Sequence, residues 1–323
     1  LKKLPVAGKL FGSTGSSGAS GSANAAAYEG AHSRDEQGIA NKPSPQEVES
    51  RLALALRETS IDGFSKIAVG SPKGGVGKSS LAYAIGCAIA NHTNIRVCLV
   101  DADPEFGATR SLVPRPVPYS IVELARDADE LHRLSDIRNY VAQNERMRLD
   151  VLLNPSEMIH KAQIGDLPTA YERIDDALSR FYDLVNYDMG IGFSHPQIQK
   201  ILSLSDELLL VGDSEVVPND IFGDALSYLQ GLDFSLDNAT LAISHRLPPT
   251  DESATTGLVK SEHATKLRRV TEIPYDASFS QLLNRRAFRV DALSLQTRLG
   301  ILTTAAASLE GLRSNTAGPR KKG

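Results

Sequence analysis

Cysteine is scarce in this chain of 323 residues, which contains only Cys87 and Cys98. Both lie at apolar positions and no C-x-x-C pair exists, so we interpret both as core residues. Two isolated cysteines exclude a disulfide-stapled scaffold and argue against a protein that carries metal between paired cysteines. They predict a reducing compartment.

Long apolar runs and a strong net charge are also missing. No apolar run approaches the roughly 20 residues that span a bilayer, and the N-terminus lacks the apolar core of a signal peptide. The formal net charge is −4 and the pI is about 6.0, which gives no overall attraction to nucleic acid. We therefore expect a cytoplasmic protein with no stable membrane insertion.

Hydrophobic residues make up 41% of the chain, enough for a sizeable core. The first 43 residues are rich in Gly, Ser and Ala and offer too little apolar surface to offset the cost of ordering them. After them, Ser44, Pro45 and Glu47 form the pattern of a capped helix start. We expect a disordered arm, a flanking helix, one large folded domain and a basic disordered tail: residues 1–43, 44–60, 61–313 and 314–323.

The stretch KIAVGSPKGGVGKSS, residues 66–80, predicts a buried strand, a glycine-rich loop and a helix in that order. A phosphate-binding loop requires this context, because glycines let backbone N–H groups converge on a phosphate and the helix dipole adds to them. Lys78 would contact the β- and γ-phosphates, and the Ser79 hydroxyl would complete a Mg²⁺ shell. The residues expected to line the nucleotide here are Gly74, Gly75, Val76, Gly77, Lys78, Ser79 and Ser80.

Pro72 replaces the first glycine of the strict G-x-x-x-x-G-K-[ST] pattern, and Lys73 stands inside the loop. The run KGGVGKS resembles the deviant Walker A loop of the ParA/MinD superfamily of ATPases. This resemblance implies ATP and Mg²⁺ as ligands and a homodimer that forms on ATP binding. It also implies that Lys73 reaches the phosphates held by the partner copy. A chance glycine turn is the alternative, and a run of this length rarely matches at random.

The next predicted strand, residues 95–100, ends in Asp101-Ala102-Asp103-Pro104. Carboxylates at the carboxyl end of a parallel strand face the crevice where ligands bind. The segment resembles the D-x-D switch of the family, which implies that Asp101 supports Mg²⁺ and that Asp103 positions the attacking water. Without the nearby loop, a turn-forming cap would be the commoner interpretation.

A third segment, YDLVNYDMGIG from residue 182 to 192, predicts a strand that ends in Asp188. It resembles the Walker B segment of the family. The resemblance implies that Asp188 holds Mg²⁺ through water and that Gly190 and Gly192 let the backbone approach the γ-phosphate. Asn186 interrupts an otherwise apolar strand and needs hydrogen-bond partners if it is buried.

The remaining pattern alternates strands with helices. The family often places Asn-Arg after a late strand, and this chain has His245 and Arg246 there, which we take as base-binding positions. The substitution leaves open whether the base is adenine or guanine. Further strands are predicted at 149–153, 207–212 and 240–244, and helices at 120–128, 131–143, 166–182 and 301–312. This order predicts an α/β P-loop NTPase fold, a single domain with a doubly wound, mostly parallel sheet and helices on both faces.

The segment 260–289 is locally basic, with seven Lys or Arg against three Asp or Glu. By resemblance to DNA-partitioning relatives, it could hold non-specific DNA through phosphates, and a solvated face is the alternative. The arginines in question are Arg268, Arg269, Arg285, Arg286 and Arg289. The Ala-rich last helix lacks the basic and bulky pattern of a membrane-surface helix.

Together these features predict a slow, dimeric, Mg²⁺-dependent ATPase that an unknown partner protein stimulates. Its cargo would belong to DNA partition, conjugation or a secretion apparatus. The alternative is a nucleotide-gated scaffold with little or no turnover, and a bacterial tyrosine kinase would carry a tyrosine-rich tail that this chain lacks. The expected catalytic residues are Lys73, Lys78 and Asp103, and the expected metal-site residues are Ser79, Asp101 and Asp188.

Overall fold

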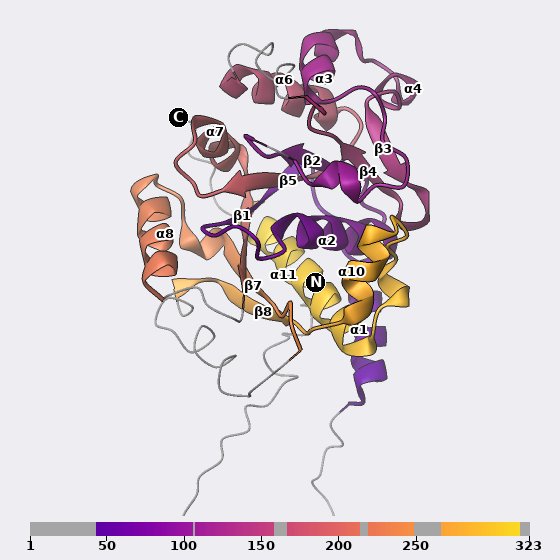
Figure 1. Cartoon of the computed structure of the whole chain (residues 1–323), viewed down its shortest axis with the longest axis vertical. Helices are drawn as coiled ribbons and strands as arrows, with labels where there is room; N and C mark the ends of the chain where they lie inside the picture. Colours follow the sequence, from indigo (N-terminus) through magenta and orange to yellow (C-terminus); the bar gives the residue numbers. More distant parts are fainter. Residues whose placement is uncertain (1–42, 106, 158–166, 214–218, 249–265, 317–323) are drawn as a thin grey trace, which may run out of the picture.

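The structure is a computed structural model that describes residues 43–105, 107–157, 167–213, 219–248 and 266–316 (Figure 1). Within these residues, eight strands form one sheet in the order β3-β4-β2-β5-β1-β6-β7-β8. Every neighbouring pair is parallel except the edge pair β3 and β4, which is antiparallel. The predicted α/β fold with a mostly parallel sheet is confirmed. The expected arm and most of the expected tail lie outside the described residues.

The strands are short, as buried parallel strands usually are. They are β1 (Ser65–Ser71), β2 (Val97–Ala102), β3 (Val141–Asn144), β4 (Leu149–Leu152), β5 (Leu184–Ile191), β6 (Glu207–Asp213), β7 (Ala239–Ser244) and β8 (Arg269–Ile273). The α-helices are α1 (Pro45–Arg57), α2 (Lys78–His92), α3 (Ile121–Asp127), α4 (Leu134–Ile137), α6 (Leu167–Ser179), α7 (Pro196–Leu204), α8 (Asn219–Gly231), α10 (Ala277–Asn284) and α11 (Leu295–Thr316).

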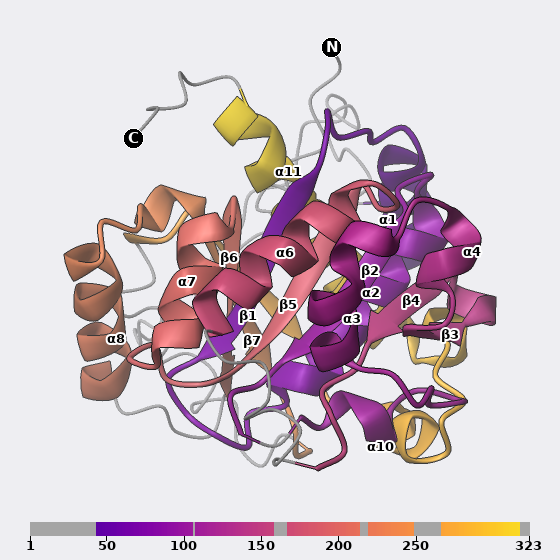
Figure 2. The same cartoon turned by 90° about the horizontal axis from the view of Figure 1, so that it is seen from above.

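Helices cover both faces of the sheet. Apolar residues of α3, α6, α7 and α8 form one core cluster, and those of α1, α2, α10 and α11 form the other (Figures 1 and 2). Cys87 and Cys98 are both buried and unpaired, as expected of core residues. No helix among the described residues is long and apolar enough to cross a membrane.

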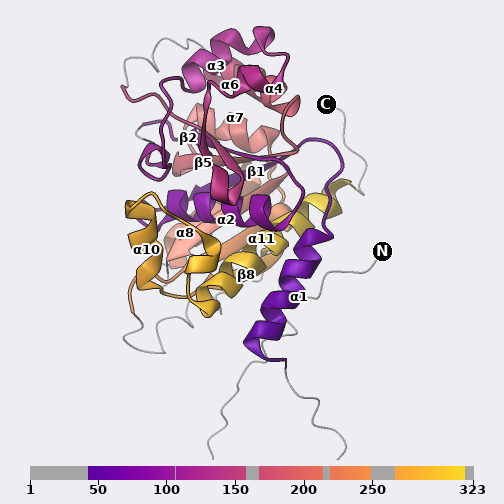
Figure 3. The same ribbon diagram turned by 90° about the vertical axis from the view of Figure 1, so that its right-hand side faces the viewer.

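The capped helix at the start of the described chain is confirmed as α1, which lies along α11 (Figure 3). Ser44 Oγ accepts a hydrogen bond from Glu47 N at 3.3 Å, and Glu47 Oε2 accepts one from Ser44 N at 2.7 Å. Its Glu49 pairs with Arg298 of α11 at 2.6 Å. The two hydrogen bonds between Ser44 and Glu47 satisfy two backbone donors that a helix start otherwise leaves without a partner.

Two expectations about elements are wrong. The predicted helix over 131–143 is reduced to the single turn α4, and Val141–Asn144 instead form β3 against β4. Pairing with the sheet edge outweighs local helix propensity there. The last helix was predicted over 301–312, and α11 extends past both of these ends, from Leu295 to Thr316. Strand β8 was not predicted.

Asn186 of β5 is fully buried, and neither its Nδ2 nor its Oδ1 has a hydrogen-bond partner in the chain. The sequence analysis required partners for this amide if it was buried, and within the described residues the chain provides none. Its Nδ2 lies 3.6 Å from where a Cβ on Gly86 of α2 would stand. An unpaired buried amide costs about 1–3 kcal/mol, so it opposes rather than supports the packing of α2 on the sheet.

A buried ion pair lies at the amino-terminal end of β6, inside the sheet. Glu207, the first residue of β6, is fully buried, and its Oε1 accepts hydrogen bonds from Arg268 Nη2 at 2.5 Å and Thr240 Oγ1 at 2.8 Å. A Cβ on Gly311 would stand 2.2 Å from Glu207 Oε2, so a glycine at that point of α11 leaves room for the carboxylate. Burial raises the pKa of Glu207 to about 7, although Arg268 lowers it.

This pair predicts a pH dependence of stability. The unfolded chain ionises Glu207 near pH 4.5 and the folded chain near pH 7, so the stability that the protonated form provides is lost as pH rises through that window. We expect Glu207→Gln to gain stability relative to wild type with rising pH, by up to about 3 kcal/mol between pH 4.5 and 8. Urea unfolding at several pH values measures this difference, and a difference that stays constant with pH would contradict it.

Candidate functional site

The glycine-rich loop joins the carboxyl end of β1 to the start of α2. Gly75 and Gly77 have φ values of 77° and 88°, a left-handed conformation that residues with a side chain rarely adopt. Gly77 is the N-cap of α2 and provides no side-chain cap, so the first N–H groups of the helix have no cap acceptor. Backbone in this arrangement suits an anion such as a phosphate.

Lys78 points from the first turn of α2 toward β5. Its side chain is 9% exposed, and Nζ lies 2.5 Å from Asp188 Oδ1 and 3.5 Å from Ser79 Oγ. The strand register explains the meeting, because β5 pairs with β1 and places Asp188 opposite Val69, just before the loop. The structure thus brings together the lysine, serine and second aspartate that the sequence analysis singled out.

Asp101 lies beside this group. Strands β2 and β5 pair in a register that sets Asp101 opposite Asp188, and both side chains are buried. Burial, and next the charge of Asp188, raise the pKa of Asp101 to about 6. Burial also raises the pKa of Asp188, against the lowering effect of Lys78. Two adjacent buried carboxylates, of which only Asp188 has a lysine partner in the described part of the chain, leave a local deficit of positive charge.

That deficit fits a hard divalent cation. Asp101 Oδ1 and Asp188 Oδ2 are buried and have no hydrogen-bond partner among the described residues. Neither this site nor any other place in the described part of the chain has three or more His, Cys, Asp or Glu side chains that could hold a metal ion on their own. Mg²⁺ in nucleotide sites takes one or two carboxylates and completes its shell with water and phosphate oxygens. The donor set of Ser79, Asp101 and Asp188 meets this requirement.

The turn after β2 brings Asp103 against Gly190 of β5. Asp103 Oδ1 accepts a hydrogen bond from Glu105 N at 2.8 Å. A Cβ on Gly190 would stand 2.5 Å from Pro104 Cδ and 3.2 Å from Asp103 Oδ1, so only a glycine permits this approach. The two segments predicted to face the γ-phosphate are therefore in direct contact.

The other predicted residues take different positions. Lys73 is exposed, and its backbone N donates to Ser71 Oγ at 3.2 Å. Arg246 Nη1 donates to the carbonyl of Gly75, so this arginine joins the loop. His245 Nε2 lies 3.6 Å from Glu272 Oε2 on β8, which orients the imidazole toward that strand. The roles of all three remain predictions.

Sequence reasoning missed four residues that shape the site. Gly107 lies directly against Asp101, since a Cβ there would stand 2.1 Å from Asp101 Oδ2. The backbone N of Thr109 donates to the same oxygen at 3.2 Å. The amides of Asn154 and Gln197 hold the turn after β2, as described below. None belongs to a motif, and a glycine four residues after the D-x-D was the one available signal.

Two of the five arginines proposed for DNA lie inside the fold, which corrects the expected surface. The side chains of Arg268 and Arg269 are 16% and 19% exposed, and they pair with Glu207 and Glu310. Arg289 pairs with Asp291 at 2.8 Å. Arg285 and Arg286 are exposed, and Arg289 keeps 39% of its side chain exposed, so these three remain on the surface as the prediction required.

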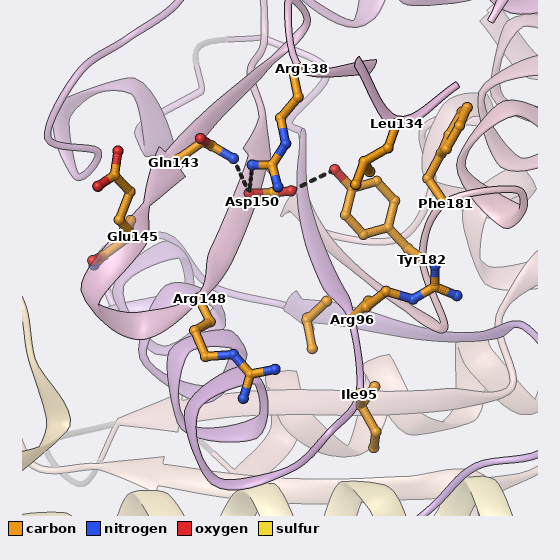
Figure 4. Close-up of a pocket in the computed structure, with 12 residues that line it drawn as sticks. Ile95, Arg96, Leu134, Arg138, Gln143, Glu145, Arg148, Asp150, Phe181 and Tyr182 are labelled. Atoms are coloured by element: carbon orange, nitrogen blue, oxygen red, sulfur yellow. Dashed lines mark hydrogen bonds and ion pairs between the residues drawn. The ribbon is translucent and has the colours of Figure 1, made fainter. Parts of the chain in front are cut away.

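A cavity of about 460 Å³ lies at the amino ends of the strands, away from the glycine-rich loop at their carboxyl ends (Figure 4). Arg96 and Arg148, which line it, directly precede β2 and β4, so the cavity opens at the amino ends of these strands. Asp150 inside it accepts hydrogen bonds from Tyr182 Oη and Gln143 Nε2, both at 2.8 Å. None of the predicted nucleotide residues lines this cavity, so it is separate from the loop site.

Comparison with known proteins agrees with this geometry. Residues 67–290 match the family model described as the CobQ/CobB/MinD/ParA nucleotide binding domain. The chain is 30% identical over 217 residues to the ESX-1 secretion-associated protein EspI of Mycobacterium tuberculosis. That alignment spans 66% of this chain and only 32% of the relative.

Solved structures share the fold at low identity. A ParA family ATPase from Chlorobium tepidum superposes with a TM-score of 0.61 at 18% identity, over 75% of this chain and 98% of that one. The septum site-determining protein MinD of Pyrococcus horikoshii, solved with Mg-ADP, gives 0.57 at 16% identity, over 75% and 94%. The family model covers most of the described sheet, and its match includes the loop and both aspartate segments. The resemblance to ParA and MinD is thereby confirmed, and this chain belongs to the CobQ/CobB/MinD/ParA nucleotide-binding domain family.

Proposed function

We propose that the chain is a Mg²⁺-dependent ATPase that closes as a dimer around ATP and reopens after hydrolysis. The observation that carries this proposal is the buried pair Asp101 and Asp188. Each has an oxygen without a partner among the described residues, Asp188 contacts Lys78, and Asp101 lies opposite Asp188 in the strand register. Such a pair next to a glycine loop serves a cation that bridges protein and phosphates.

Each side chain has a distinct part in the proposed reaction. Ser79, Asp101 and Asp188 would hold Mg²⁺, which neutralises charge on the phosphates when it is bound. Lys78 would leave Asp188 for the β- and γ-phosphates, and Asp103 would orient the attacking water. Lys73 would extend from its exposed position to the phosphates of the partner copy. Hydrolysis would then require two chains, which suits a slow timer rather than a metabolic enzyme.

Lys73→Ala tests the dimer requirement. We expect ATP turnover to fall by about 10³-fold, the lower end for a cation supplied by a partner. ATP affinity should stay within about threefold, because Lys78 and the loop backbone are unchanged. Turnover per chain in wild type should rise with protein concentration. Lys266→Ala, an exposed lysine away from the loop, is the matched control and should behave as wild type.

The same assay decides between the ATPase and the nucleotide-gated scaffold. A wild-type chain that binds ATP and dimerises but shows no turnover, with or without partner proteins, would favour the scaffold. A Lys73→Ala chain with full turnover would contradict the exchange of lysines between copies.

For the cargo, we propose a secretion apparatus. The support is the relative EspI, whose name places it with ESX-1 secretion, and the fold shared with MinD and ParA proteins. The chain spans about a third of that relative, so the proposal concerns the ATPase part. Purification of the tagged chain from cells, with ATP and after Lys78→Ala, tests it: secretion components should co-purify only with the nucleotide-binding form. Added duplex DNA in the ATPase assay tests whether Arg285 and Arg286 contact phosphates.

A further inference from the structure

The turn that carries Asp101 and Asp103 is held from two sides by buried amide side chains. We define the D-x-D turn as residues 101–105 and 107–109. It follows β2, whose neighbours in the sheet are β4 and β5. Asn154 lies just after β4, and Gln197 lies in the first turn of α7, which follows β5. Each neighbouring strand therefore leads into one of the two amides.

The contacts are short and specific. Gln197 Nε2 donates to the carbonyl oxygen of Ala102 at 2.6 Å and to Tyr171 Oη at 2.9 Å. Asn154 Nδ2 donates to the carbonyl oxygen of Asp103 at 2.9 Å. Both amides are almost fully buried, Gln197 at 0% and Asn154 at 3% exposed. Two consecutive carbonyls of the turn are thus bound by two side chains that lie 51 and 95 residues away.

The amide orientations follow from these partners. A carbonyl oxygen only accepts, so the nitrogen of each amide must face it, and reversing either amide would set two oxygens together. The other amide atoms, Asn154 Oδ1 and Gln197 Oε1, are buried, and the part of the chain that the structure describes offers them no hydrogen-bond partner. An unpaired buried oxygen costs free energy. The unpaired oxygens therefore offset part of what the donated hydrogen bonds contribute to folding, and the donated bonds determine where the turn lies.

We propose that Asn154 and Gln197 are positioning residues that fix the D-x-D turn for hydrolysis, and that Gln197 links this turn to the segment after β5. Gln197 is the second residue of α7 and comes five residues after Gly192, so movement of the Gly190–Gly192 backbone would reach Ala102 through this amide as well as through the pairing of β5 with β2. Asp103 also contacts Gly190 directly, which makes the two segments one unit. This inference rests on the proposed hydrolysis, because it assigns Asp101 to Mg²⁺ and Asp103 to water.

Gln197→Met tests the inference, since methionine keeps the length of the side chain and removes the donor. We expect kcat for ATP to fall about tenfold, because the water and the metal ligand lose their fixed position. KM and ATP affinity should stay within about twofold, as the loop is untouched. The matched control is Gln199→Met on the same helix, whose amide contacts Ser194 and Tyr228 instead and which should leave kcat unchanged.

Hydrogen exchange gives a readout that does not depend on turnover. In the chain without nucleotide, backbone amides between Asp101 and Arg110 should exchange about tenfold faster in Gln197→Met than in wild type. Asn154→Leu, which acts from the other side of the turn, should give the same local increase. If Gln197→Met fails to fold, Asn154→Leu decides the matter alone.

The outcomes separate this inference from the proposed function. Wild type without turnover would refute the hydrolysis. Faster exchange confined to the D-x-D turn in the two variants would still show that Asn154 and Gln197 hold this turn in place. Unchanged exchange and unchanged kcat in both variants would overturn the inference. A rise in KM with kcat unchanged would also overturn it, because that pattern indicates lost binding rather than lost positioning.

Discussion

Lys78→Ala is expected to stop ATP turnover and also to destabilise the chain without nucleotide by about 3–5 kcal/mol. The second effect follows from the partner of Lys78. Lys78 Nζ lies 2.5 Å from Asp188 Oδ1, and Asp188 is buried beside Asp101. Removing the lysine leaves two carboxylates in the core with no cation, which is the costly way to break a buried ion pair.

Urea unfolding without nucleotide or metal measures this cost, and Asp188→Asn supplies the control. The double variant Lys78→Ala with Asp188→Asn should regain most of the lost stability, because the amide carries no charge to leave unpaired. It should remain inactive, since both the phosphate contact and a metal-site residue are gone. A Lys78→Ala chain as stable as wild type would contradict the inferred role of Lys78 in neutralising Asp188. Added Mg²⁺ should restore part of the stability of the single variant by occupying the carboxylates.

The parts of the site that were predictable are continuous runs whose residue types determine local structure. The loop at residues 73–79 needs its glycines for left-handed backbone, and the structure has Gly75 and Gly77 in that conformation. Asp101 and Asp188 lie in the carboxyl-terminal halves of the buried strands β2 and β5, and parallel strands present their carboxyl ends at one edge. Adjacency of these strands then follows from the fold, so the meeting of the two aspartates could be expected from the sequence.

The parts that were missed depend on distant pairing. Gln197 and Ala102 are 95 residues apart, and no local pattern marks a glutamine in a helix as the partner of a switch carbonyl. In the sequence, nothing distinguishes Arg268 from a surface arginine. Its ion pair with Glu207, 61 residues away, is evident only in the fold. Val141–Asn144 form a strand because β4 offers an open edge. In each case a tertiary contact outweighs the local preference, which a single sequence does not reveal.

Gly107→Ala is expected to lower ATP turnover by about 100-fold while leaving ATP bound. A Cβ at this position would stand 2.1 Å from Asp101 Oδ2 and 2.4 Å from its Cγ, closer than real Cβ atoms approach other atoms. Asp101 is fixed by β2 behind it and by Thr109 N at 3.2 Å, so the carboxylate has little room to retreat. The metal ligand or the turn must shift, and a displacement of about 1 Å at a reacting centre costs roughly 100-fold.

The control for this change is Gly231→Ala at the end of α8, where nothing lies within 4 Å of the added Cβ. That variant should match wild type in turnover and in stability, which shows that an extra methyl group is harmless where space exists. For Gly107→Ala, half-maximal turnover should require a higher Mg²⁺ concentration than in wild type, because the disturbed group is the Asp101 carboxylate. The atoms nearest to the added methyl group are those of Asp101 and not those of Lys78 or the loop, so affinity for the nucleotide alone should change little. Full turnover in Gly107→Ala would mean that Asp101 can move without consequence, and the assignment of this carboxylate to the metal site would then fail.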